Sequence, residues 1–268
     1  MNQLNQRRAG RLAVRLIAVA VFSAVLSVSA GAQTDPLEVE KITPYTGPPI
    51  FLDEPEPKPA ATLVEKQVVT DKYADGTVRV EREIARYSDD RRAADGVYRE
   101  YYPKGQLFVE GQYRDGAQHG EWTYWHESGK KSRTVNFKNS RPDGTWDVFR
   151  ADGTLEAKRG YRDGKRDGTW IHYDQTGKQP LSEENYTDGK ADGVWKAWFP
   201  SGQLQKQIGF KMGVRHGDAL EWDEEGNQRV EARYEEGKPH GTATAWLPDG
   251  RKFVQEYDHG KIISRSQE

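Results

Sequence analysis

The stretch Tyr161-Arg-Asp-Gly-Lys-Arg-Asp-Gly168-Thr-Trp-Ile-His-Tyr-Asp-Gln-Thr-Gly177 decides the fold of this chain of 268 residues, because close copies of it recur in phase. Its second glycine belongs to a set spaced 24 residues apart, with one interval of 25 residues: Gly96, Gly120, Gly144, Gly168, Gly193, Gly217 and Gly241. A second set follows the first by nine residues each time: Gly105, Gly129, Gly153, Gly177, Gly202, Gly226 and Gly250. A period of this length indicates an array of small units, none of which buries a core alone.

Each unit reads as one β-hairpin. A short run rich in aromatic residues and threonine follows the opening glycine, a glycine turn such as Ala151-Asp-Gly153 ends it, and a run of alternating polarity comes next. The second run closes on an aromatic residue in every unit: Tyr113, Phe137, Tyr161, Tyr186, Phe210, Tyr234 and Tyr257. A lone hairpin is marginal in water. The sequence therefore predicts an all-β fold, an elongated antiparallel meander of about seven stacked β-hairpins in a single twisted sheet over residues 96–261.

Two aromatic positions recur within the first run. The position two residues after the opening glycine holds Tyr98, Trp122, Trp146, Trp170 and Trp195, and then Ala219 and Ala243. The position five residues after it is aromatic throughout: Tyr101, Trp125, Phe149, Tyr173, Trp198, Trp222 and Trp246. Side chains three apart on a strand point to opposite faces. We expect the second set to line the inner face and the first to form an outer ridge.

Trp122, Trp146, Trp170 and Trp195 are thus the candidate partner-binding residues, about 10 Å apart in a row. Such a row could stack on sugar rings or receive an extended partner. The alternative, which we favour, is that these indoles pack on flanking strands and hold a thin sheet together, since aliphatic residues are few.

The flanking segments are assigned from their composition. Residues 1–32 carry four arginines, an apolar run and the cleavage motif Ala30-Gly-Ala32, which is typical of a secretory signal peptide. Residues 33–62 hold seven prolines and are read as a disordered linker. Residues 63–95 are predicted to form a degenerate capping hairpin and residues 262–268 a polar tail. The mature protein is accordingly expected in the periplasm or outside the cell, after cleavage near Ala32.

Charge and composition exclude several partners. Removal of the four arginines with the signal segment takes the formal net charge from −2 to −6. A mildly acidic chain is a poor candidate for nucleic acid, which rewards a basic surface, and it lacks the basic amphipathic stretch of a membrane-surface binder. The chain has no cysteine, which excludes a disulfide framework.

The motif aromatic-x-Asp-Gly-Lys-x-x-Gly-x-Trp-x-x-Tyr-x-x-x-Gly resembles the MORN repeat, and more closely its bacterial variant in proteins known as YwqK-type antitoxins. The stretches 161–177 and 186–202 carry the resemblance best, and it covers about Gly96 to Lys261. It implies an elongated sheet of hairpins that binds proteins or lipids, and it brings no catalytic residue with it.

Catalytic and metal chemistry find little support. His119, His216 and His240 precede an opening glycine, where the other units carry Asp95, Asp143, Asp167 and Asp192, so this position is read as a polar turn residue. Successive copies would lie about 9–10 Å apart, too far to share one zinc ion. Asp163 to Gly168 lacks the ligand pattern of a calcium loop. We expect no metal and no cofactor.

The chain also lacks a nucleophile elbow, a catalytic triad and a dinucleotide fingerprint. The one irregularity is the 25-residue unit with Glu183-Glu184, read as a β-bulge in the strand. We expect a non-enzymatic exported scaffold that binds another protein. The alternative is a cell-wall or polysaccharide-binding module that uses the aromatic ridge.

Overall fold

The computed structural model describes residues 61–268. The predicted signal peptide and all of the predicted linker but its last two residues lie outside this range. Every regular element within residues 61–268 is a β-strand. The strands are β1 (Leu63–Lys72), β2 (Val78–Tyr87), β3 (Arg92–Tyr101), β4 (Leu107–Arg114), β5 (Ala117–Trp125), β6 (Lys131–Lys138), β7 (Arg141–Pro142), β8 (Gly144–Phe149), β9 (Leu155–Arg162), β10 (Lys165–Arg166), β11 (Gly168–Tyr173), β12 (Pro180–Thr187), β13 (Lys190–Ala191), β14 (Gly193–Trp198), β15 (Leu204–Lys211), β16 (Val214–Trp222), β17 (Gln228–Glu235), β18 (Lys238–Pro239), β19 (Gly241–Trp246), β20 (Lys252–Asp258) and β21 (Lys261–Gln267).

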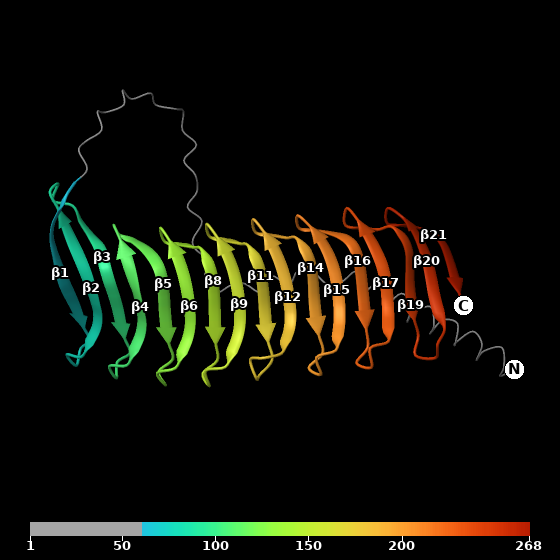
Figure 1. The fold of residues 1–268 in the computed structure, drawn as a ribbon, viewed down its shortest axis with the longest axis horizontal. Helices are drawn as coiled ribbons and strands as arrows, with labels where there is room; N and C mark the ends of the chain where they lie inside the picture. The colour runs from blue at the N-terminus through green and yellow to red at the C-terminus, as the bar shows by residue number, and fades with distance from the viewer. Residues whose placement is uncertain (1–60) are drawn as a thin grey trace, which may run out of the picture. The chain divides into compact units, whose positions relative to one another are not determined.

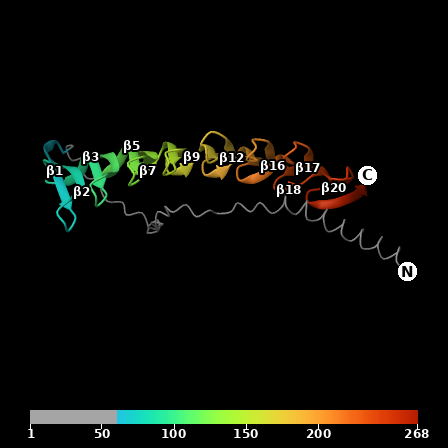
Figure 2. The same cartoon turned by 90° about the horizontal axis from the view of Figure 1, so that it is seen from below.

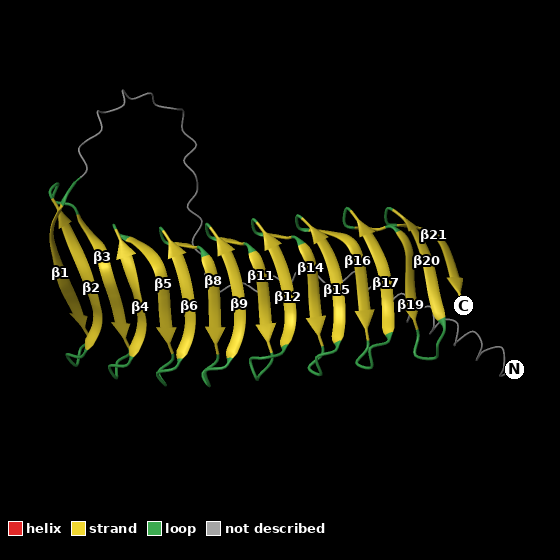
Figure 3. Ribbon diagram, in the orientation of Figure 1, coloured by secondary structure: helices red, strands yellow, loops and turns green. Residues whose placement is uncertain are grey.

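These strands form one open antiparallel sheet in which each hairpin lies beside the next along the chain (Figures 1 and 3). The short strands β7, β10, β13 and β18 are the first pieces of opening strands that break before the opening glycine. Seen from below, the strands make a single layer (Figure 2). The predicted fold class, a meander of stacked hairpins, is confirmed.

Tight loops connect each unit to the next and fix the repeat distance. In the loop Arg162-Asp-Gly-Lys165, both central residues have positive φ, as a type I′ turn requires. The N–H of Gly164 donates to the carbonyl oxygen of Pro142 in the preceding loop at 2.8 Å. The same bond recurs along the array, from Gly116 to Ala94, Ser140 to Gln118, Gly189 to Arg166, Gly213 to Ala191, Gly237 to Arg215 and Gly260 to Pro239. At this end of the strands, a continuous series of hydrogen bonds thus joins the loops of neighbouring units.

The hairpin turns lie at the other end of the strands, and one of them contains the extra residue of the 25-residue unit. In an ordinary unit the N–H of Arg150 donates to the carbonyl of Thr154, whereas in this unit the N–H of Asp174 reaches one residue further, to Gln179. The side chain of Asp174 accepts bonds from the Thr176 hydroxyl and from the backbone N–H groups of Lys178 and Gln179. The predicted bulge at Glu183-Glu184 is therefore wrong. An insertion in a strand would turn the following side chains to the other face, whereas a turn absorbs it.

Both ends of the sheet carry an added strand or hairpin. At the N-terminal end, β1 and β2 form a hairpin that pairs with β3, within the segment read as a capping hairpin. At the other end, residues 261–267 form β21, which pairs with β20 from Phe253 to Asp258. The segment read as a polar tail is thus exposed but paired, because β20 would otherwise present an unpaired edge.

The core is a thin layer on one face of the sheet. Trp122, Trp146 and Trp170 are 2%, 5% and 5% exposed, and small aliphatic side chains such as Val109 and Val135 lie among them. In the last two units Ala219 and Ala243 replace the tryptophan, and Ile208, Val230, Ala232, Tyr234 and Ala245 complete the core. The predicted face assignment is inverted, because the position two residues after the opening glycine is buried and the position five residues after it is half-buried.

Candidate interaction surfaces

The buried tryptophans belong to an unbroken row of aromatic rings, which we name the aromatic row. Its members are Tyr98, Tyr113, Trp122, Phe137, Trp146, Tyr161, Trp170, Tyr186, Trp195 and Phe210. Neighbouring ring centroids lie between 4.5 and 6.2 Å apart, within the range of favourable aromatic pairs. The row alternates the residue two after an opening glycine with the residue that closes a hairpin, so it crosses every unit boundary from Tyr98 to Phe210.

Three of the four indoles of the row are also hydrogen-bonded to the preceding strand, whereas Nε1 of Trp146 has no hydrogen-bond partner within residues 61–268. The Nε1 atoms of Trp122, Trp170 and Trp195 donate to backbone carbonyl oxygens ten residues earlier, at 3.2, 2.9 and 3.0 Å. Arg166 lies over the Trp170 ring at 4.3 Å from its centroid. Three of the four predicted partner-binding tryptophans are thus enclosed, and Trp195 is partly buried. Their partner-binding role stays a prediction, while their packing against flanking strands is what the structure contains.

The opposite face of the sheet, which we name the polar face, carries the second aromatic set. Strand register places Glu110, Thr123, Thr134, Asp147 and Lys158 in one row across neighbouring strands. The row extends in both directions through Glu81, Arg99, Ile171, Glu183, Lys196, Gln207, Leu220, Glu231, Thr244 and Val254. No other element of residues 61–268 covers this face, because the described elements form one sheet.

The half-buried aromatics enter this face near the hairpin turns. The Tyr101 hydroxyl donates to a carboxylate oxygen of Glu81 at 2.8 Å. Trp125 borders a shallow hollow of about 270 Å³ over β3 to β6. The hollow is lined mainly by polar groups: Val97, Glu110, Gly111, Gln112, Glu121, Thr123, Trp125 and Lys131. A ring beside carboxylates, an amide and a hydroxyl can both stack on a flat apolar group and hydrogen-bond a polar one.

Acidic groups outnumber basic ones on the polar face. The carboxylates include those of Glu81, Glu110, Glu121, Asp147, Glu183, Asp218, Glu231 and Glu256, and the basic groups include those of Arg99, Lys131, Lys158, Lys196, Arg233 and Lys252. Some of them pair across strands, as Arg99 does with Glu110 at 3.2 Å. The face is therefore a mixed, net acidic surface.

Side chains at the hairpin turns form a series of bonds that sequence reasoning missed. Tyr73, Tyr102, His126 and Arg150 stand three residues before a turn glycine, and each contacts a backbone carbonyl of the next hairpin. The acceptors are the carbonyls of Tyr101, Trp125, Phe149 and Tyr173, at 2.7 to 3.1 Å. The residue types differ, so no motif marks the position. Their common signal is a long polar side chain three residues before the first four turn glycines, a pattern that ends at Asp174.

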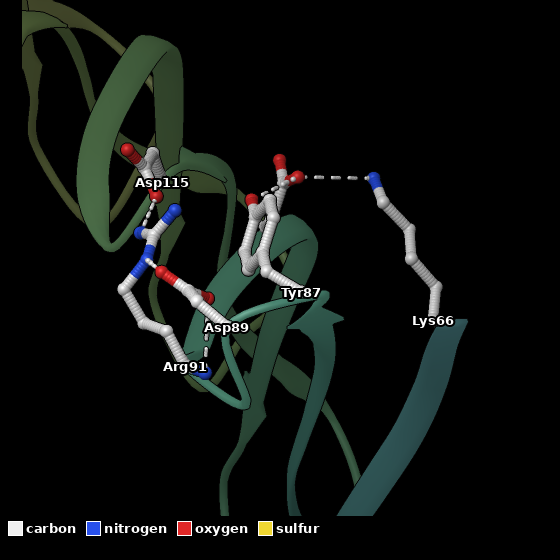
Figure 4. A network of polar contacts seen from close by, with 6 residues as sticks. Lys66, Tyr87, Asp89, Arg91 and Asp115 are labelled. Atoms are coloured by element: carbon white, nitrogen blue, oxygen red, sulfur yellow. Dashed lines mark hydrogen bonds and ion pairs between the residues drawn. The ribbon is translucent and has the colours of Figure 1, made fainter. Parts of the chain in front are cut away.

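A polar network joins the N-terminal hairpin to the first units (Figure 4). Asp95 accepts a hydrogen bond from the Tyr87 hydroxyl at 3.2 Å and pairs with Lys66 at 3.5 Å. Arg91 lies 4.1 Å above the Tyr87 ring and pairs with Asp115 of the following loop. Burial, followed by the bond to Asp95, raises the pKa of Tyr87. These contacts hold the first hairpin against the array.

The residue before each opening glycine has a structural role in most units. Asp143, Asp167 and Asp192 accept the N–H of the αL turn residue of the next loop, which is Asp163, Asp188 or Met212. His240 does the same for His259 through its Nδ1 atom at 3.4 Å. These hydrogen bonds explain why the position before the opening glycine holds a polar turn residue. The structure also brings Glu235, His240 and His259 together, a group that the sequence did not reveal.

Burial shifts the pKa of several groups on the tryptophan side of the sheet. It raises the pKa of Tyr98 and of Tyr186 to about 12, with additional contributions from Glu100 and Glu184. Burial, helped by the charge of Arg159, lowers the pKa of His172.

Within residues 61–268 there is no helix of the length and apolarity that a membrane crossing requires. Comparison with curated proteins gave no match. The family model of the MORN repeat variant matches residues 94–115, 118–139 and 191–212. Each match begins two residues before an opening glycine and ends two residues after a closing aromatic, so the matches share one phase with the hairpins. The sheet is therefore a repeat array in which three units match the family model of the MORN repeat variant.

Proposed function

We propose that this chain is a non-enzymatic, exported scaffold whose polar face binds an extended protein partner. The observation that carries the proposal is the polar face itself: no other element of residues 61–268 covers it, it spans every described hairpin, and it offers a half-buried aromatic residue in each unit. Aromatic side chains with mixed charges around them are typical of protein-binding surfaces. The match to the MORN repeat variant supports a scaffold, and export rests on the signal-like segment 1–32.

The proposed contact surface differs from the aromatic ridge that the sequence suggested. Removing Trp146 or Trp170 would damage the core and would change binding through unfolding. The half-buried Trp125, Trp198 and Trp222 are better placed to touch a partner. We further propose that the likeness to YwqK-type antitoxins reflects shared hairpin architecture, with the binding specificity set by the polar face.

Sequence neighbours on one strand give a matched test, because they point to opposite faces. A photo-crosslinking amino acid at Lys158, Lys196 or Gln207 reports on the polar face, and one at Arg159, Ala197 or Lys206 reports on the other. In intact cells we expect one adduct of defined mass from the first set only. Equal adducts from both sets, or none from the first, would reject the polar face as the contact surface. Mass spectrometry of the mature N-terminus tests export separately.

A polysaccharide ligand is the second candidate, favoured by the hollow beside Trp125. Glu110, Glu121 and Gln112 would hydrogen-bond sugar hydroxyls while the indole stacks on a ring. Co-sedimentation with purified cell wall and with soluble glycans tests this. A polysaccharide ligand would be supported if Trp125→Ala abolishes binding and the Trp222→Ala variant still binds. Absence of binding to every glycan would reject a polysaccharide ligand.

A further inference from the structure

Two histidines and two carboxylates meet at the last unit boundary, between the loop that holds β18 and the turn between β20 and β21. One side-chain ligand atom from each of Glu235, His240 and His259 lies within 4.8 Å of the other two. Nε2 of His240 is 3.7 Å from Glu235 Oε2, and the two imidazole centroids are 4.5 Å apart. All of these side chains are partly open to solvent, so they can rotate.

Asp258 lies beside both imidazole rings. Its Oδ1 atom is 2.6 Å from Nδ1 of His259 and 3.8 Å from Nδ1 of His240. A carboxylate at Nδ1 holds the proton on that atom and leaves Nε2 free to bind a metal, as it does for many metal-binding histidines. Asp258 is thus a positioning residue for the His259 ring, while Nδ1 of His240 accepts the backbone N–H of His259.

The other unit boundaries lack this combination. The position held by Glu235 follows the closing aromatic, and earlier units place a basic or neutral residue there: Arg114, Lys138, Arg162, Thr187 and Lys211. His119 and His216 occupy the same repeat position as His240, but Arg114 and Lys211 stand five residues before them. The turn position of His259 holds Asn139 and Glu236 at those two boundaries. Among the three boundaries with a histidine at this position, that of His240 alone has a potential metal-ligand side chain at all three repeat positions.

We propose that Glu235, His240 and His259 bind one divalent transition-metal ion of the zinc class. Two imidazoles and a carboxylate with an open fourth position form an established ligand set for Zn²⁺. Tetrahedral ligands at Zn–N and Zn–O distances near 2.0–2.2 Å stand roughly 3.4 Å apart. Since the three atoms lie within 4.8 Å of one another, each pair needs to close by at most about 1.4 Å. The bound ion would fasten the final hairpin to the unit before it.

The test is calorimetric titration of the full chain with ZnCl2, with MgCl2 as the second probe. We expect one Zn²⁺ per chain and no heat from Mg²⁺, because Mg²⁺ prefers an all-oxygen shell. His240→Asn and His259→Asn should each weaken Zn²⁺ binding about tenfold or more, and Asp258→Asn about tenfold. Asparagine keeps a side-chain acceptor at position 240 and already occupies the left-handed turn position as Asn139, so the fold is retained.

His216→Asn is the matched control and should leave the affinity unchanged. A second measurement needs no variant: Zn²⁺ should protect His240 and His259, but not His216, from acylation by diethylpyrocarbonate, as read by mass spectrometry. Absence of Zn²⁺ binding, equal loss in His216→Asn, or equal binding of Mg²⁺ would each overturn the proposal. Protection of all three histidines would do so as well.

Discussion

The indole Nε1 of Trp170 donates a hydrogen bond to the carbonyl oxygen of Gly160 at 2.9 Å, which ties the opening strand of one hairpin to the closing strand of the hairpin before it. Trp122 and Trp195 make the same bond to Gln112 and Asn185. In these three units the tryptophan thus stabilises the boundary between units. A sheet with a single layer depends on such boundaries, because it has no second layer against which to bury its residues.

Replacement of Trp122 by alanine should destabilise the array severely. The side chain is 2% exposed and contacts Tyr98, Tyr113 and Phe137. We expect a loss of about 3–5 kcal/mol in the free energy of unfolding, measured by chemical denaturation. Trp198→Ala, at the half-buried aromatic position, is the control and should cost clearly less. A loss in Trp122→Ala no larger than in the control would contradict the assignment of the core.

Gly160 should tolerate alanine less well than Gly168. A Cβ atom on Gly160 would stand 2.1 Å from the carbonyl oxygen of Asp167, so the backbone of the next loop would have to move. Gly168 has open space around it and a φ of +84°, which costs alanine about 1–2 kcal/mol. We expect Gly160→Ala to lose roughly 3 kcal/mol by the same denaturation measurement. The reverse order of the two losses would refute the close approach.

Much of the fold could be predicted from the sequence, because the 24-residue period determines the hairpins and the loop glycines. The choice of buried face could not be predicted from the period. Trp170 and Tyr173 are both aromatic and lie on opposite faces, and only the fit of the indole over the preceding strand decides that Trp170 is enclosed. The group of Glu235, His240 and His259 was missed for a related reason. His259 occupies a different repeat position from His240, so alignment of like positions cannot pair them.

Deletion of Lys178 should be tolerated. It restores the 24-residue spacing, and the residue lies in the turn from Asp174 to Gln179, outside the paired strands. We expect a change in the unfolding free energy of less than about 1 kcal/mol. Deletion of Glu183, which lies inside β12, should unfold or strongly destabilise the chain, because it turns the following side chains to the other face. Similar effects of the two deletions on the thermal midpoint would contradict the location of the insertion.

Acidification should weaken the fold through His172. Burial lowers the pKa of this imidazole in the folded chain, so the unfolded chain binds the proton more readily. The contribution of His172 to stability is therefore complete above its ordinary pKa of about 6.5 and falls as the pH drops below it. The free energy of unfolding should be lower at pH 5.5 than at pH 7.5, and His172→Gln should narrow that difference. An unchanged difference would exclude His172 as the source.

Tyr186 should ionise late in an alkaline titration. Burial and the bond to Glu184 raise its pKa to about 12, above the ordinary value near 10. Its contribution to stability is present below about pH 10 and is lost as the pH rises toward 12. Ultraviolet absorbance of the phenolate should show a late phase that Tyr186→Phe diminishes. A titration curve with the same late phase in the variant would contradict this.

The loop bonds of the type that joins Gly164 to Pro142 link each hairpin to its immediate neighbours along the array. Thermodynamically, such an array behaves as a linear lattice of coupled elements, in which the total stability is a sum of unit and boundary contributions. Unzipping from either end then costs one boundary at a time, whereas opening in the middle costs two at once. Whole hairpins can therefore be added or removed without changes to the remaining units. The length of the array can thus change in evolution independently of the residues on its polar face.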